Sequence, residues 1–214
     1  MRIRVLVADD HTLVADGLRS LIAAQPDMEA VGQAADGREA LRRALELRPD
    51  VVVMDLTMPE MNGIEAARAI RAKLEATRVV MVSMHSSPEH VQRALEAGAV
   101  GYLVKRSASR ELIAAIRAVH AGRRYFGENI AESVIERYVG KEATRDPLSA
   151  LSARERQVLQ LLAESRSVAE IARSLSLSPK TVETYRARLF DKLGIRDLPA
   201  LVRFAIQHGV TPLE

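Results

Sequence analysis

The chain has 214 residues, of which 48% are hydrophobic and 28% charged, a composition typical of a globular protein with one large or two small domains. It has no cysteine, which excludes disulfides and thiolate metal sites, and no apolar run approaches the roughly 20 residues of a membrane span. We therefore expect a cytoplasmic protein without a signal peptide. The net charge of +3 resides entirely in residues 145–214, which favours a nucleic-acid partner for that part.

Apolar runs alternate with helical patterns from residue 1 to about 121. We expect strands near 2–8, 28–34, 51–55, 78–83 and 101–104, and helices near 11–24, 37–48, 63–73, 88–97 and 109–121. Five such units predict an α/β domain with right-handed crossovers and five parallel strands. A TIM barrel needs about twice this length, so the sheet is expected to be open and doubly wound.

Residues 122–149 have the composition of a linker, broken by glycines and Pro147, with a short helix expected at Ile130–Val139. Residues 150–214 show only helical patterns and predict an all-α domain of four helices. These are expected at Leu151–Ala163, Ser167–Leu175, 179–193 and Leu198–His208. Ser152 with Glu155 forms a capping-box pattern, and Gly194 has the place of a C-cap.

Four apolar runs each end on residues that can bind a cation or a phosphate. These residues are Asp9 with Asp10, then Asp55, Ser83 and Lys105. Because ligands of open α/β sheets bind beyond the carboxyl ends of the strands, we expect the five side chains to share one edge. Clustered carboxylates without cysteine or several histidines suit Mg²⁺. The alternative is that they are separate loop residues in contact with solvent.

Four stretches in residues 1–121 carry a resemblance to a known family. They are VLVADDH at 5–11, VVVMDLTMPEMNGIEAARAIR at 51–71, VVMVSMH at 79–85 and ALEAGAVGYLVK at 94–105. With these motifs the region resembles the receiver domain of bacterial two-component response regulators. The resemblance implies a flavodoxin-like fold and transfer of a phosphoryl group from a sensor histidine kinase to Asp55.

The resemblance also implies roles for the residues around the acceptor. Asp10, Asp55 and the backbone carbonyl of Thr57 would bind Mg²⁺ directly, and Asp9 would act through a water molecule. Lys105 would pair with the phosphoryl group. These roles agree with general chemistry, since phosphoryl transfer depends on positioning and on neutralising charge.

Two further residues, Ser83 and Tyr102, are implied to form a switch pair. The Ser83 hydroxyl would move to the phosphoryl oxygens, and Tyr102 would then turn inward. The chain departs from many receivers in having Ser83 in place of threonine, and Arg106 in place of a proline after Lys105. We therefore expect no cis peptide there, and we expect His11 only to begin a helix.

The helices at 167–175 and 179–193, joined by a tight turn, predict helix-turn-helix geometry. In the second helix, helical spacing places Val182, Tyr185, Leu189 and Leu193 on one face. The same spacing turns Lys180, Glu183, Thr184, Ala187, Arg188 and Asp191 outward, a set that fits a major groove. The alternative is a solvated helix of an ordinary bundle.

The segment LSARERQVLQLLAESRSVAEIARSLSLSPKTVETYRARLFDKLGI at 151–195 is similar to the LuxR-type helix-turn-helix of the NarL/FixJ family. By position, this resemblance turns Lys180, Glu183, Thr184 and Ala187 toward bases, and Thr181 and Arg188 toward phosphates of double-stranded promoter DNA. Glu183 could accept a hydrogen bond from cytosine or could pair with Arg186 or Lys180.

The last helix has an apolar arc wider than packing on one domain requires. A wide core face would explain this arc, but the family resemblance implies a dimer surface. Its residues are Ala200, Val202, Phe204 and Ile206. The sequence thus predicts a response regulator that dimerises on phosphorylation and regulates transcription, with RNA polymerase as a further partner. It is not expected to be an enzyme. The alternative function is an adaptor whose helical domain binds a protein.

Overall fold

The computed structural model describes residues 2–128, 130 and 147–211, which fall into two units, one within residues 1–142 and one within 143–214. The expected helix at Ile130–Val139 lies outside the described residues, except for Ile130 itself. The domain boundaries at 121 and 150 remain a prediction. Among the residues that the structure describes, no helix is both long and apolar enough to cross a membrane.

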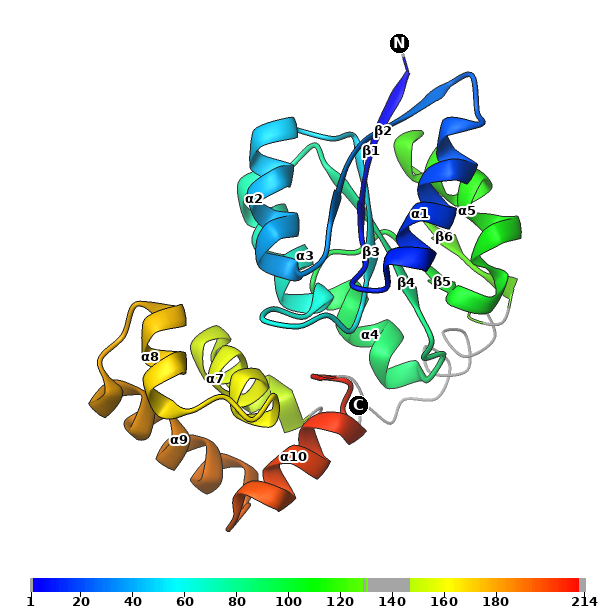
Figure 1. The fold of residues 1–214 in the computed structure, drawn as a ribbon. Coiled ribbons are helices and arrows are strands. Elements are labelled where there is room, and N and C mark those ends of the chain that lie inside the picture. Colours follow the sequence, from blue (N-terminus) through cyan, green and yellow to red (C-terminus); the bar gives the residue numbers. More distant parts are fainter. Residues whose placement is uncertain (1, 129, 131–146, 212–214) are drawn as a thin grey trace. The chain divides into compact units, whose positions relative to one another are not determined.

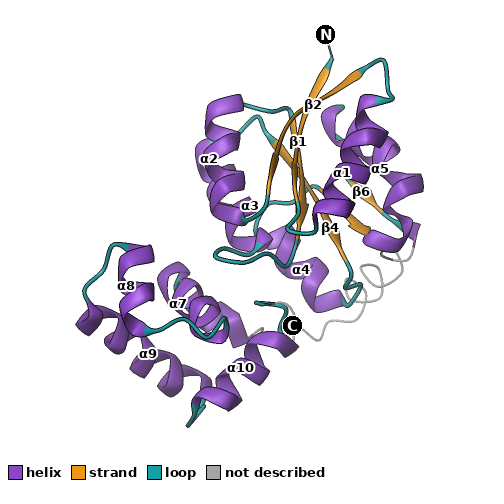
Figure 2. Cartoon of the chain, in the orientation of Figure 1, coloured by secondary structure: helices purple, strands orange, loops and turns teal. Residues whose placement is uncertain are grey.

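The first unit is built on one parallel sheet with the strand order β2-β1-β3-β4-β5-β6 (Figures 1 and 2). The strands are β1 (Ile3–Ala8), β2 (Met28–Ala34), β3 (Val51–Asp55), β4 (Arg78–Ser83), β5 (Gly101–Val104) and β6 (Tyr125–Phe126). The first five lie where the sequence predicts them. The prediction of five strands was wrong by one, because β6 forms in the expected linker and pairs with β5. Two residues are too few to show a strand period.

Helices cover both faces of this sheet, which confirms the doubly wound arrangement (Figure 1). The helices are α1 (Thr12–Ala23), α2 (Gly37–Leu47), α3 (Gly63–Lys73), α4 (Pro88–Glu96) and α5 (Lys105–His120). Side chains alternate along each strand, so Val5 and Val7 of β1 pack with α1 and α5, whereas Leu6 packs with α2 and α3. The carboxyl ends of β1, β3, β4 and β5 therefore meet at one edge.

Helix α5 begins at Lys105, four residues earlier than predicted. Val104 is the extended residue before it, and the Ser107 hydroxyl donates to the Val104 carbonyl at 3.2 Å. Arg106 allows this early start, because a proline at this position would disfavour the helical conformation of Lys105 before it. The described residues contain no cis peptide bond. The early start places Lys105 directly at the end of β5.

The second unit is the predicted helical domain. It contains a 3₁₀ turn, η1 (Pro147–Ala150), and the helices α7 (Ala153–Ala163), α8 (Val168–Leu175), α9 (Pro179–Leu193) and α10 (Leu198–Gln207). Ser152 and Glu155 form the predicted capping box, Ser178 caps α9, and Gly194 ends α9 with a φ of 64°. An aliphatic core joins the four helices.

Candidate functional site

Three strand ends bring Asp9, Asp55 and Lys105 together. Asp9 follows β1, Asp55 is the last residue of β3, and Lys105 follows β5. The Lys105 ammonium nitrogen lies 2.8 Å from a carboxylate oxygen of Asp9 and 2.8 Å from one of Asp55. Both carboxylates are almost fully buried, and the Lys105 side chain is 9% exposed. The structure thus places residues that are 50 positions apart in one buried ionic cluster.

Asp10 and His11 extend this cluster toward solvent. Potential ligand atoms of Asp9, Asp10, His11 and Asp55 all lie within 4.8 Å of one another. The His11 backbone N–H donates to Asp9 at 2.9 Å, and its Nδ1 lies 2.8 Å from an Asp10 oxygen. His11 begins α1 as expected, but the sequence analysis did not include it in the cluster. The only signal for it was its place next to the two aspartates.

The negative charge of this cluster exceeds what Lys105 can neutralise. Burial raises the pKa of Asp55 from its ordinary value of 3.8 to about 6, and Asp9 and Asp10 add to the rise, while Lys105 opposes it. Burial lowers the pKa of Lys105, but the two buried carboxylates outweigh burial and raise it. A cation would relieve the repulsion, and carboxylate oxygens are the ligands that Mg²⁺ prefers.

The loop after β3 is held close to Asp55. Thr57 is half-buried, two positions beyond the aspartate. The Gly63 N–H donates to the Leu56 carbonyl at 2.8 Å, and a Cβ atom at Gly63 would lie only 1.9 Å from the Asp55 carbonyl oxygen. Glycine at this position therefore lets α3 approach the backbone that carries Asp55.

Ser83 is the last residue of β4 and Tyr102 the second residue of the neighbouring strand β5, and both are fully buried. The Tyr102 hydroxyl donates to the His85 carbonyl at 2.8 Å, and the His85 N–H donates to the Ser83 hydroxyl oxygen at 3.0 Å. Burial raises the pKa of Tyr102 to about 12, although the nearby Ser83 side chain lowers it. The ring of Tyr102 therefore lies inside the protein.

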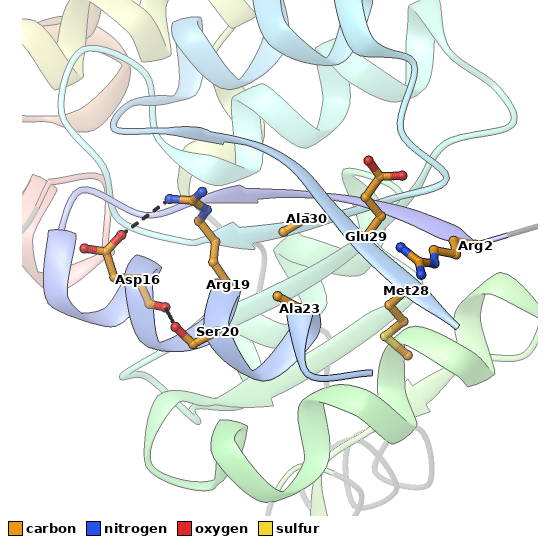
Figure 3. Close-up of a pocket in the computed structure, with 8 residues that line it drawn as sticks. All are labelled: Arg2, Asp16, Arg19, Ser20, Ala23, Met28, Glu29 and Ala30. Carbon is orange, nitrogen blue, oxygen red and sulfur yellow. Dashed lines mark hydrogen bonds and ion pairs between the residues drawn. The ribbon is translucent and has the colours of Figure 1, made fainter. Parts of the chain in front are cut away.

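A separate open pocket lies between α1 and β2 and contains none of the predicted site residues (Figure 3). Arg2, Arg19 and Glu29 contribute charges of both signs to its lining. Arg19 pairs with Asp16 at 3.6 Å and donates to Gln33 at 3.1 Å. These pairings identify Arg19 and Asp16 as ordinary surface contacts.

In the second unit, α9 has the two faces that its sequence predicts. Val182 and Leu189 are fully buried, whereas Tyr185 and Leu193 are partly buried against the same core. Lys180, Glu183, Thr184, Ala187 and Arg188 are exposed, and Thr181 is half-buried. Glu183 lies 3.4 Å from Arg186, which is one of the pairings expected for it. The Thr184 hydroxyl donates to the Lys180 carbonyl at 3.0 Å.

A contact that the sequence analysis missed joins α9 to α7. The Lys192 ammonium lies 2.7 Å from the Glu155 carboxylate, which also accepts from the Ser152 N–H. Burial raises the pKa of Glu155, but Lys192 and Ser152 outweigh burial and lower it. No sequence signal connects the two partners, because they are 37 positions apart.

In α10, Leu201 and Ala205 enter the core completely. The residues predicted to form a dimer surface are half-buried, namely Ala200, Val202, Phe204 and Ile206. Leu198 at the start of the helix is 44% exposed. The helix thus has apolar surface beyond the part that its own domain covers.

Comparison with known proteins identifies both units. Residues 5–117 match the response regulator receiver domain, and residues 149–205 match the bacterial regulatory proteins of the luxR family. The chain is 37% identical over 212 residues to the response regulator UvrY of Escherichia coli (strain K12), covering 99% of this chain and 97% of UvrY. The chain belongs to the NarL/FixJ family of two-component response regulators. It is a phosphorylatable protein that binds DNA to regulate transcription.

Two further similarities span nearly the whole of this response regulator. The response regulator GacA of Pseudomonas viridiflava is 40% identical over 208 residues, which cover 97% of each chain. A solved structure of two RcsB dimers bound to two parallel DNAs has a TM-score of 0.59 and 26% identity, covering 95% of this chain and 98% of that one. Both similarities extend across the receiver and the helical domain.

Proposed function

We propose that Asp55 accepts the phosphoryl group from the phosphohistidine of a sensor histidine kinase. The observation that carries the proposal is the buried Asp55 carboxylate at the end of β3, 2.8 Å from the Lys105 ammonium. In the transfer, an Asp55 oxygen attacks phosphorus and the P–N bond to the kinase imidazole breaks. The imidazole leaves with the electron pair and takes up a proton. The Lys105 ammonium pairs with the phosphoryl oxygens and offsets their negative charge as the group approaches Asp55.

The donor set fits Mg²⁺, and we assign the ligands accordingly. Asp10, Asp55 and the Thr57 carbonyl would bind the ion directly, and Asp9 would bind it through water. Bound there, Mg²⁺ would neutralise charge on the carboxylates and the phosphoryl oxygens. The 23% exposure of the Asp10 side chain supports this assignment, because Mg²⁺ keeps several waters and needs an open side.

Ser83 and Tyr102 are proposed as the switch pair. The Ser83 hydroxyl would donate to a phosphoryl oxygen, and the inward Tyr102 ring would fill the adjacent space. The Tyr102 ring is fully buried, so phosphorylation would act by stabilising this inward arrangement, which is a shift in population.

Acyl-phosphate labelling with acetyl phosphate tests the acceptor and the metal together. Asp55→Asn should abolish labelling, and Asp10→Ala should weaken Mg²⁺ binding with little effect on secondary structure. Asp16→Asn is the control, because Asp16 is exposed on α1 and outside the cluster. Labelling of Asp55→Asn at the parent level, or full labelling of the parent in chelator, would contradict the assignment.

For DNA, we propose that Lys180, Glu183, Thr184 and Ala187 face bases and that Thr181 and Arg188 contact phosphates. Arg188→Ala should weaken binding to all sequences and reduce the salt slope by about one. Lys180→Ala should instead change the sequence preference. Arg154→Ala, exposed on α7, is a matched control. If neither α9 variant differs from the parent, the recognition face is elsewhere.

The half-buried residues Ala200, Val202, Phe204 and Ile206 of α10 are proposed to form the DNA-bound homodimer, with phosphorylation favouring it. Ala200→Arg and Ile206→Arg test the two flanks of the helix. One of them should weaken binding to a palindromic site at least tenfold, or about 1.4 kcal/mol. Parent-like binding by both folded variants would exclude this surface.

The remaining assignments follow from the proposed chemistry. Because promoter DNA in bacteria lies in the cytoplasm, we propose that the protein acts there, with RNA polymerase as a further partner at the promoter. The phosphoryl group stays on Asp55, so the protein is not classed as an enzyme.

A further inference from the structure

Two imidazole rings stack on each other between β4 and α4. The ring centroids of His85 and His90 lie 4.6 Å apart, with only 9° between the ring planes. His90 is buried on the inner side of α4, whereas His85 is exposed and covers it. A stacked pair of this kind fixes the loop that carries His85 to the helix that carries His90.

A hydroxyl group at the start of α4 holds the buried ring. Ser87 occupies the N-cap position, where a serine usually accepts a bond from the helix backbone. Its side chain makes no such bond, and its oxygen instead lies 2.7 Å from Nδ1 of His90. This contact fixes the orientation of the His90 ring against which His85 stacks.

The backbone of His85 binds both residues of the proposed switch pair. Its N–H donates to the Ser83 hydroxyl oxygen at 3.0 Å, and its carbonyl accepts from the Tyr102 hydroxyl at 2.8 Å. A movement of this residue therefore displaces a partner of Ser83 and of Tyr102 at the same time. The ring stack is the side-chain contact that anchors His85 to α4.

We propose that the His85–His90 stack is a positioning element of the switch: it holds the loop at residues 84–87 so that the Tyr102 ring stays inside the protein. This rests on the proposed roles of Ser83 and Tyr102. Loss of the His85 ring removes the anchor and leaves the backbone groups free to move with the loop. The ratio of outward to inward Tyr102 should then rise about fivefold, the size typical of one aromatic pair.

Fluorine NMR of the full chain labelled with 3-fluorotyrosine measures this ratio without any phosphodonor. The chain has four tyrosines, and Tyr102→Phe identifies the resonance to follow. His85→Ala should move or broaden the Tyr102 signal toward a solvent-exposed position. His85→Phe should restore the parent signal, because it keeps a ring that can stack. Ser86→Ala, an exposed residue of the same loop, is the control.

Variants of the buried partner separate stacking from hydrogen bonding. His90→Phe keeps a ring but loses the bond to Ser87, whereas His90→Asn keeps a polar group but loses the ring. The proposal predicts a Tyr102 signal closer to the parent for His90→Phe than for His90→Asn. The opposite order, or an unchanged Tyr102 signal in His85→Ala, overturns it.

The readout separates this inference from the function on which it rests. If Asp55 proves not to be the acceptor, labelling with acetyl phosphate fails but the Tyr102 signal still responds to His85→Ala. If the stack does not position the loop, labelling succeeds and the Tyr102 signal stays unchanged.

Discussion

Replacing Asp55 by asparagine should stabilise the metal-free receiver at neutral pH, although it removes the proposed acceptor. The folded protein raises the pKa of Asp55 from 3.8 to about 6, mainly through burial. At about 1.4 kcal/mol for each tenfold change in proton affinity, this corresponds to about 3 kcal/mol. Because Asp55 is only 4% exposed, solvent screening reduces the figure little. Asparagine has the same shape and carries no charge.

The sign of the effect follows from proton linkage. A carboxyl group with a raised pKa favours the folded state below pH 3.8, and this contribution is lost as the pH rises through about 6. At pH 8 the ionised Asp55 therefore destabilises the parent protein, and Asp55→Asn should gain about 1–3 kcal/mol in chelator. The gain should shrink as the pH is lowered toward 4. Mg²⁺ should stabilise the parent much more than the variant, because in the variant a neutral amide replaces one of the negatively charged ligands of the ion.

Urea unfolding of the full chain, read by hydrogen-exchange mass spectrometry on peptides of β1, β3 and β4, follows the receiver separately from the helical domain. Asp16→Asn is the control for a change of one charge on the surface. The reasoning fails if Asp55→Asn is less stable than the parent at pH 8 in chelator. It also fails if the difference between the two does not depend on pH.

Further predictions concern backbone packing and the contact between α7 and α9. Gly63→Ala should destabilise the receiver by about 1–3 kcal/mol and weaken Mg²⁺ binding, because the alanine Cβ would press on the Asp55 carbonyl. Unfolding in urea and Mg²⁺ titrations identical to those of the parent would contradict this. Lys192→Met should destabilise the helical domain by about 1–2 kcal/mol in urea unfolding, because the Glu155 carboxylate loses its ionic partner. The effect stays small because the Lys192 side chain is 38% exposed and solvent screens the pair. The lowered pKa of Glu155 should make that domain lose stability as the pH falls below about 4.5, and Glu155→Gln should flatten this dependence. An equal acid dependence in both proteins would exclude Glu155 as its source.

Much of the receiver could be predicted because its strands are buried on both faces. Such strands appear as continuous apolar runs, and Val51–Met54 in β3 is the clearest case. The parallel topology then requires the residues after the runs to meet at one edge, which is how Asp9, Asp55 and Lys105 were placed together. The caps at Ser152 and Ser178 were also readable, because their partners lie only three residues away.

The features that were missed depend on contacts between distant segments or on very short elements. β6 contains two residues and forms only because β5 offers an edge. The pairing of Lys192 with Glu155 depends on how α9 crosses α7. The stacking of His85 on His90 depends on the path of a loop, for which the sequence shows only two histidines five positions apart.

The central claim is that phosphorylation of Asp55 controls binding to DNA by the other domain. It is tested most directly by fluorescence anisotropy of the full chain on a site selected from genomic fragments, with and without acetyl phosphate and Mg²⁺. The account predicts that the phosphodonor raises the affinity of the parent at least tenfold, or about 1.4 kcal/mol, and leaves Asp55→Asn unchanged. An equal increase in Asp55→Asn, or no increase in a parent protein shown to be labelled, would contradict it.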